Sequence, residues 1–226
     1  MKKYSLFQNK RISDYTVRRL SMYLRTLNFL EQSGVETVSS EEIAKIEGFT
    51  SAQVRKDLSY FGSFGRRGLG YNVTALRKRI SIILGLNRKW NISLIGAVPL
   101  NGIGGALLNY EEFKKKRLTI TKIFDKDPKI VGTKIKGITV RHIDELERKI
   151  DPRKEPIAIL TVPPQDVQSI INRLDKIGVK GVLYFASRTI SIPKKMIVRN
   201  EDTVMELEAL TYHIANKTKR QLKTLK

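Results

Sequence analysis

The chain has 226 residues, of which 41% are hydrophobic and none is cysteine. This length allows one or two domains with a buried core, and the absence of cysteine excludes disulfides, cysteine zinc sites and thiol chemistry. Forty-three basic residues against 22 acidic ones give a net charge of +21, and a field of this sign attracts polyanions such as nucleic acid.

Two further properties limit the class of protein. No apolar run approaches the ~20 residues that cross a membrane, and the polar N-terminus does not have the pattern of a signal peptide. Together with the lack of cysteine, this leads us to expect a cytoplasmic protein. For the C-terminal part, a lysine-rich surface of the thermophile type is an alternative explanation of the positive charge.

The first part of the chain is predicted to be helical. Ser13 can cap a helix of about twenty residues that ends at Gly34, with leucines recurring at helical spacing. Ser39 and Glu42 have the spacing of a capping box, which predicts a second helix.

A third helix is predicted over about 51–60, where Thr50 and Gln53 offer another capping box. The two short helices form a helix-turn-helix candidate. The apolar stripe of the third helix consists of Val54, Leu58 and Phe61. Its candidate DNA-binding residues are Ser51, Gln53, Arg55, Lys56, Ser59 and Tyr60. Polar side chains on such a helix read base edges and phosphates, although an ordinary solvated helix face is the alternative.

A glycine-rich, aromatic and basic segment follows over 62–71, with Arg66 and Arg67 between two glycines. Glycines permit the positive φ of a hairpin turn, and the two arginines can reach phosphates or a minor groove. A helix-turn-helix followed by a basic hairpin is typical of a winged helix. A further helix over 74–84 completes this part.

The second part alternates between strands and helices. We predict strands at 90–95, 119–124, 138–140, 157–162 and 182–185, a helix at 165–177, and a last helix from Glu201. This alternation indicates a parallel sheet with right-handed crossovers. The last helix carries Val204, Leu207, Leu210 and Ile214 on one side, and the basic tail over 217–226 ends the chain.

The first strand of this sheet runs into a glycine-rich loop. A strand, such a loop and a helix can hold a pyrophosphate on backbone N–H groups. The loop is longer than G-x-G-x-x-G and contains Pro99, so a glycine-rich turn without a ligand is the alternative. The candidate cofactor-binding residues of the loop are Gly96, Leu100, Asn101, Gly102 and Gly104, and Thr161 and Pro163, at the end of the strand predicted at 157–162, are further candidates.

Asp125 supports the ligand-binding interpretation. It follows the second strand, 21 residues after Gly104, where an acid accepts the hydroxyls of the adenosine ribose and repels a 2′-phosphate. NAD(H) is therefore favoured over NADP(H), and Lys126 beside it weakens that preference. An acid or base for hydride-transfer chemistry is not evident, because the possible proton carriers Tyr110, Thr161 and Tyr184 have no identifiable partner. We expect no catalytic residue and no metal.

Several segments resemble the Rex family of redox-sensing transcriptional repressors. They are Val38-Ser39-Ser40, 51–62, 65–71, Phe124-Asp125-Lys126-Asp127-Pro128 and 158–163. The resemblance implies a winged-helix domain over 1–86, a Rossmann-like domain over 87–200, and a dimerisation helix with a basic tail over 201–226. It also implies a homodimer with swapped C-terminal helices, bound to AT-rich palindromic operators and released from them by NADH.

The resemblance assigns roles to single residues as well. The segment 53–60 would be the recognition helix and Arg66-Arg67 the wing. Tyr110 would lie near the nicotinamide, and Arg19 and Asp202 would form a switch pair between subunits. The irregular glycine loop departs from the family pattern. A repressor of this fold with weakened or lost NADH sensing is therefore an alternative, as are an NAD-dependent oxidoreductase with a basic appendage and a protein that binds DNA without sequence preference.

Overall fold

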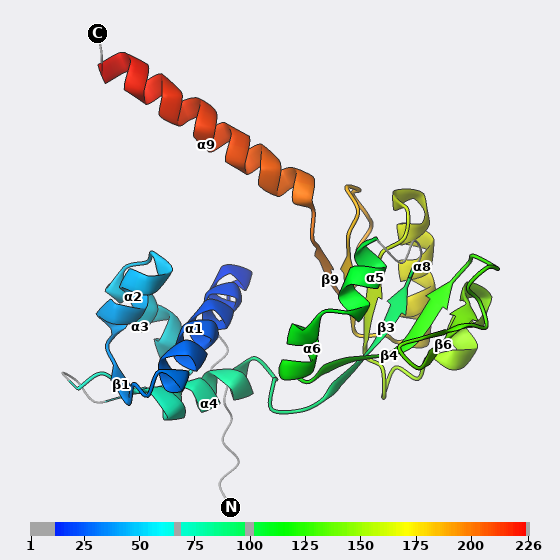
Figure 1. Ribbon diagram of the computed structural model, residues 1–226, viewed down its shortest axis with the longest axis horizontal. Coiled ribbons are helices and arrows are strands. Elements are labelled where there is room, and N and C mark those ends of the chain that lie inside the picture. The colour runs from blue at the N-terminus through cyan, green and yellow to red at the C-terminus, as the bar shows by residue number, and fades with distance from the viewer. Residues whose placement is uncertain (1–11, 66–68, 98–101, 225–226) are drawn as a thin grey trace, which may run out of the picture. The chain divides into compact units, whose positions relative to one another are not determined.

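The computed structural model describes residues 12–65, 69–97 and 102–224 (Figure 1). The chain divides into two compact units, residues 1–88 and 89–226, and each unit is described by itself. Among the described residues, no helix is long and apolar enough to cross a membrane.

The first unit consists of helices around one apolar core. Its elements are α1 (Asp14–Gln32), β1 (Thr37–Val38), α2 (Ser40–Glu47), α3 (Ser51–Ser59), β2 (Tyr71–Asn72) and α4 (Val73–Ile83). Its core includes the predicted stripe of α3, Val54, Leu58 and Phe61, which is at most 5% exposed. Leucines of α1 and apolar residues of α2 and α4 complete the core.

The predicted helix starts are confirmed at two places and half confirmed at a third. Ser13 caps α1, and Ser39 and Glu42 form a complete capping box at α2. At α3, Thr50 accepts a hydrogen bond from the backbone N–H of Gln53. The Gln53 side chain does not return to the cap, however, because its amide donates to Asp57 at 2.9 Å. The expected second capping box is therefore only half present.

The segment around the expected hairpin has a different strand partner from the one predicted. β2 pairs antiparallel with β1, which precedes α2, and residues 62–65 form no strand. Gly65 and Gly70 both have positive φ, 78° and 73°. A Cβ atom on Gly65 would overlap the carbonyl oxygen of Gly70, so the two ends of the loop approach each other closely. Arg66 and Arg67 lie outside the described residues.

A buried carboxylate joins α3 to α1. Asp57 is 0% exposed and accepts hydrogen bonds from Arg19 Nε at 2.6 Å, Arg19 Nη2 at 2.8 Å and Tyr23 Oη at 2.9 Å, besides the Gln53 amide. Burial alone opposes ionisation, but the hydrogen bonds from these partners outweigh it and hold the pKa of Asp57 below its ordinary value. The sequence reasoning did not identify this residue.

The second unit is built on a seven-stranded sheet. Its strands are β3 (Trp90–Ile95), β4 (Leu118–Asp125), β5 (Lys134–Ile135), β6 (Ile138–His142), β7 (Ile157–Leu160), β8 (Gly181–Tyr184) and β9 (Ile197–Asn200), in the order β5-β6-β4-β3-β7-β8-β9. The strands β6, β4, β3, β7, β8 and β9 are parallel to one another, whereas β5 pairs antiparallel with β6. The predicted parallel sheet is confirmed, but β5 and β9 were not predicted.

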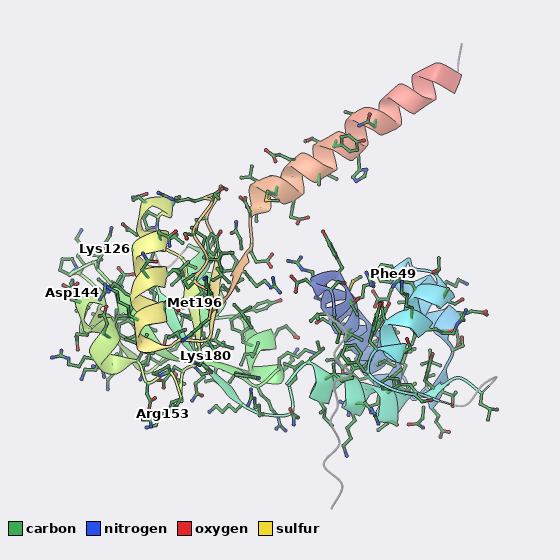
Figure 2. The ribbon with its side chains drawn as sticks, turned by 180° about the vertical axis from the view of Figure 1, so that it is seen from behind. Phe49, Lys126, Asp144, Arg153, Lys180 and Met196 are labelled. Atoms are coloured by element: carbon green, nitrogen blue, oxygen red, sulfur yellow. The ribbon has the colours of Figure 1, made fainter. Side chains whose placement is uncertain are left out.

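Helices cover both faces of this sheet. They are α5 (Ile103–Leu108), α6 (Glu111–Lys115), the 3₁₀ turn η1 (Ile143–Glu145), α7 (Leu146–Lys149) and α8 (Pro164–Ile177). On one face, Leu160 packs with Leu146 of α7 and Ile171 of α8. Met196, next to β9, belongs to the same cluster (Figure 2). On the other face, Leu94 of β3 and Phe113 of α6 belong to a second cluster.

The chain ends in α9 (Thr203–Thr224), which begins two residues later than predicted. Its apolar side chains are not covered within the described chain. Val204, Leu207, Leu210 and Ile214 are 51–60% exposed. The side chains of the basic tail over 217–226 lie outside the described residues.

Replacing Asp57 by Asn should destabilise the protein by about 3 kcal/mol near neutral pH, because Arg19 and Tyr23 lose a charged partner. Because the pKa of Asp57 in the folded protein lies below its ordinary 3.8, its contribution is complete above that pH and is lost as the pH falls through the folded pKa. Urea unfolding of both proteins at about pH 7 and about pH 3 measures the difference. Glu36→Gln, a change at an exposed acid, is the control. A difference that is the same at both pH values would contradict this role of the charge.

Candidate functional site

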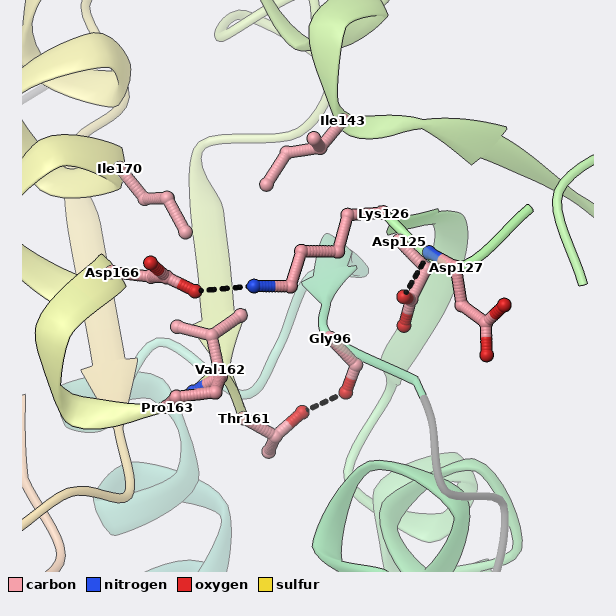
Figure 3. Close-up of a pocket in the computed structure, with 10 residues that line it drawn as sticks. All are labelled: Gly96, Asp125, Lys126, Asp127, Ile143, Thr161, Val162, Pro163, Asp166 and Ile170. Atoms are coloured by element: carbon pink, nitrogen blue, oxygen red, sulfur yellow. Dashed lines mark hydrogen bonds and ion pairs between the residues drawn. The ribbon is translucent and has the colours of Figure 1, made fainter. Parts of the chain in front are cut away.

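The strand order changes direction beside β3. From β3 the chain continues to β4 on one side of the sheet and later to β7 on the other, so the carboxyl ends of these strands flank a crevice in which such sheets bind ligands. A cavity of about 240 Å³ lies there (Figure 3). It is lined by Gly96, Asp125, Lys126, Asp127, Ile143, Thr161, Val162, Pro163, Asp166 and Ile170.

Two glycines make the turn from β3 into α5 possible. Gly96 has φ 91°, and a Cβ atom there would lie 2.8 Å from the Thr161 carbonyl oxygen. A Cβ atom on Gly104 would overlap the Gly96 carbonyl oxygen and lie 2.9 Å from Thr161 Oγ1. The first and last glycines of a dinucleotide loop have these two tasks, a tight turn and close packing of the helix on the strand. The longer loop therefore keeps both features.

Thr161 joins the ends of the two central strands. Its backbone N–H donates to the Ile95 carbonyl oxygen at 2.9 Å, and its hydroxyl donates to the Gly96 carbonyl oxygen. Pro163 follows two residues later and is the N-cap residue of α8, whose first residue is Pro164. Thr161 and Pro163 therefore form the wall of the cavity opposite Asp125.

Asp125 is held by backbone groups on both of its oxygens. Oδ2 accepts from the Ala97 N–H at 2.7 Å and Oδ1 from the Asp127 N–H at 3.0 Å, and the residue is 6% exposed. The carboxylate thus fixes the start of the glycine loop and the turn after β4. The sequence reasoning had considered it only as a ligand for a ribose.

A second polar contact crosses the cavity. Lys126 Nζ forms an ion pair with Asp166 Oδ2 at 3.0 Å, and its side chain extends from the end of β4 to the first turn of α8 (Figure 3). The sequence reasoning did not find this pair because its members are 40 residues apart.

The structure brings together part of the predicted cofactor set. Gly96, Asp125, Thr161 and Pro163 line the cavity, and Gly104 packs against Gly96. Gly102 precedes α5 as its cap and is not among the lining residues. Leu100 and Asn101 lie outside the described residues.

The predicted DNA-binding residues differ in exposure. Arg55, Lys56 and Ser59 are exposed on α3, and Arg55 Nη1 donates to Ser40 Oγ at 3.0 Å. Ser51, Gln53 and Tyr60 are half-buried. Gln53 and Tyr60 are therefore only partly available at the surface for DNA, because the Gln53 amide bonds the buried Asp57 and Tyr60 packs against the core.

Comparison with known proteins places the chain in a family. Residues 11–59 match the family model "Putative DNA-binding protein N-terminus" and residues 87–188 match "CoA binding domain". The redox-sensing transcriptional repressor Rex of Carboxydothermus hydrogenoformans is 44% identical over 204 residues, 90% of this chain and 97% of that protein. Rex of Roseiflexus sp. is 41% identical over 202 residues, 89% of this chain and 90% of that protein. The chain belongs to the Rex family.

Solved structures agree with this assignment to Rex. The structure of RSP in complex with β-NAD⁺ and operator DNA has a TM-score of 0.86 and 33% identity, and the match covers 95% of this chain and 98% of RSP. RSP is a Rex-family repressor, and its complex with β-NADH matches with a TM-score of 0.83 and 31% identity. Rex proteins are non-enzymatic regulators, so the alternative of an oxidoreductase is excluded.

Arg19, Asp202 and Tyr110, to which the Rex resemblance assigns roles in the response to NADH, each contact residues of their own unit. Arg19 is bound to Asp57. Asp202 accepts a hydrogen bond from Ser187 Oγ at 2.9 Å and another from the Val204 N–H at 2.9 Å. Tyr110 is 54% exposed, and its ring lies edge-on to Phe113 with centroids 5.3 Å apart.

Among the residues that sequence reasoning missed, Asp57 had left a signal. It lies three residues after Val54 and four before Phe61, within the arc of the apolar stripe, and an acid at such a position is buried only with polar partners. Nothing in the sequence indicated that the partners are Arg19 and Tyr23.

Gly104→Ala should destabilise the protein by a net ~1–3 kcal/mol, because the added methyl group must push α5 away from β3. The steric cost is larger than this net loss by the ~1 kcal/mol that alanine gains over glycine inside a helix. Urea unfolding measures it. Gly181→Ala is the matched control, because the nearest atoms to a Cβ atom there lie at 3.8 and 4.0 Å. Equal stability of the two variants would show that the close approach at Gly104 is unimportant.

Proposed function

We propose that this Rex protein is a transcriptional repressor that binds operator DNA through its first unit and NAD(H) through its second, and that NADH favours release from the operator. The observation that carries the proposal is the cavity at the carboxyl ends of β3, β4 and β7. It occurs in the same chain as a helix-turn-helix with basic side chains on α3.

The residues around the cavity fit one end of a dinucleotide. Its volume of about 240 Å³ is below the ~300–1,000 Å³ typical of a complete ligand pocket, and the presence of Asp125 in its lining supports the adenosine end as its occupant. Gly96 would make the tight turn that leads from β3 towards the pyrophosphate, and Asp125 would accept the ribose hydroxyls. NAD(H) itself would supply the redox signal.

The glycine loop decides between a sensing and a non-sensing repressor. Gly96 and Gly104 retain the turn and the close helix packing, which supports retained binding. Pro99 lacks an N–H group, and Leu100 has a large side chain near a position at which the family pattern has a glycine. We therefore propose weaker binding than in a protein with the regular loop, by about 10–100-fold if one or two hydrogen bonds are lost.

DNA recognition is proposed to use α3 as the recognition helix and Arg66-Arg67 as the wing. Arg55, Lys56 and Ser59 supply exposed donors, whereas Ser51, Gln53 and Tyr60 would act from the margin of the surface. The Gln53 amide is oriented by Asp57, since an ionised carboxylate can only accept hydrogen bonds. A protein that binds operator DNA must be in the compartment that contains the DNA, so the proposal includes a cytoplasmic location.

The proposed assembly is a homodimer on an AT-rich palindrome, with α9 swapped onto the second subunit. Its support is the exposed apolar stripe of α9, Val204, Leu207, Leu210 and Ile214, since an apolar face of this extent is typical of an interface. Two-fold operators match two-fold proteins. The molecular mass of the full chain in solution tests the dimer, and a monomer would refute it.

Arg55→Ala should lower operator affinity by about 1–3 kcal/mol if its guanidinium contacts a base edge. If it contacts a phosphate, affinity should fall equally for all sequences. Fluorescence anisotropy with operator and random DNA at fixed salt measures both. Lys78→Ala removes the same charge from an exposed position on α4 and should change affinity much less. Wild-type affinity in the double variant Arg55→Ala, Arg66→Ala would refute the proposed surface.

NADH should lower operator affinity more than NAD⁺ does at the same concentration, because a ligand shifts an equilibrium only by binding two states differently. NADH should bind more tightly than NADPH, and Asp125→Ala should weaken NADH binding and erase that preference. Calorimetry and operator titrations measure these effects. Absence of heat at about millimolar NADH would leave a Rex repressor without redox sensing.

The proposed switch pair is tested in the same titrations. Unchanged responses of both Arg19→Ala and Asp202→Ala to NADH and operator would refute it.

A further inference from the structure

The cavity contains an unusual arrangement of charge next to the proposed ribose site. Among the described lining residues, Lys126 is the single cation and Asp125, Asp127 and Asp166 are the acids. Lys126 directly follows the aspartate that would bind the ribose. A cation in this neighbourhood is the usual partner of the 2′-phosphate of NADP(H), so Lys126 works against the selectivity that Asp125 provides.

Asp166 counteracts this effect of Lys126. The Lys126 side chain stretches across the cavity, past Val162, and its ammonium meets Asp166 at 3.0 Å on the opposite wall (Figure 3). Asp166 lies in the first turn of α8, where the helix dipole stabilises a carboxylate. Its negative charge both holds the ammonium on the α8 side and adds to the repulsion of a phosphate.

We infer that Asp166 is a positioning residue for nucleotide selectivity: by pairing with Lys126 it keeps the pocket specific for a dinucleotide with a free 2′-hydroxyl. This inference rests on the proposed binding of NAD(H). Lys126 and Asp166 are 63% and 34% exposed, and an exposed pair of this kind is weak. Removal of Asp166 therefore frees the Lys126 ammonium beside the ribose site. The ammonium and the N-terminus of α8 then both attract a phosphate.

Asp166→Asn should raise NADPH affinity about fivefold, the limit set by the weakness of an exposed ion pair, and change NADH affinity by less than about twofold. Asp166→Glu keeps the charge and should retain the wild-type ratio of the two affinities. The double variant Lys126→Ala, Asp166→Asn should lose most of the gained NADPH affinity, because the cation is absent and only the relief of the Asp166 repulsion remains. Calorimetric titration of the full chain with each nucleotide measures these ratios, and thermal unfolding verifies that every variant is folded.

Asp175→Asn is the matched control. It removes an acid from the same helix, nine residues further along α8 and hence ~13 Å along its axis, and should leave both affinities unchanged. If wild type binds NADH but Asp166→Asn has the wild-type ratio, this inference is wrong and the proposed function stands. If wild type binds neither nucleotide, both this inference and the proposed binding of NAD(H) are wrong. An equal gain of NADPH affinity in Asp175→Asn would show that general charge, and not the pair, determines selectivity.

Discussion

The first unit depends on a single carboxylate that is shut off from water. An ionised group in that position is tolerated only if protein donors replace its hydration, and Asp57 receives them from Arg19, Tyr23 and Gln53. Because these donors lie on α1 and on α3 itself, the same bonds fix the position of α3 against α1 and the orientation of the Gln53 amide. The exposed face of α3 is thus set by a contact on its buried face.

The second unit uses a similar device. Asp125, at 6% exposure, accepts hydrogen bonds from the N–H groups of Ala97 and Asp127, and it thereby holds the end of β4 to the start of the glycine loop. A residue that would bind a ribose is therefore also a structural tie between strands. Changes at Asp125 alter the loop and the ligand contact together, whereas changes at Lys126 and Asp166 alter the charge of the cavity with little effect on the backbone.

The helices and the central strands were predictable because their signals are local. Ser39 and Glu42 lie within one turn, and β3 and β4 are apolar runs that end at a glycine or an acid. β1 and β5 have only two residues each, and β9 is a half-exposed edge strand, so neither alternation nor an apolar run marks them. The contacts of the site were not predictable for a different reason. Asp57 finds Arg19 38 residues away and Lys126 finds Asp166 40 residues away, and only the fold brings these pairs together.

The bonds of Arg19 also limit how the proposed switch can operate. Arg19 uses Nε and Nη2 for Asp57, and its side chain is 20% exposed. If it left Asp57 to meet Asp202 of another subunit, a buried carboxylate would lose its cation, which is the expensive way to break a buried pair. A guanidinium has five N–H donors on three nitrogens, so a second carboxylate can bind at Nη1 while the Asp57 bonds persist. A switch of this second kind would transmit the contact of Asp202 to α3 without unfolding the network that holds α3.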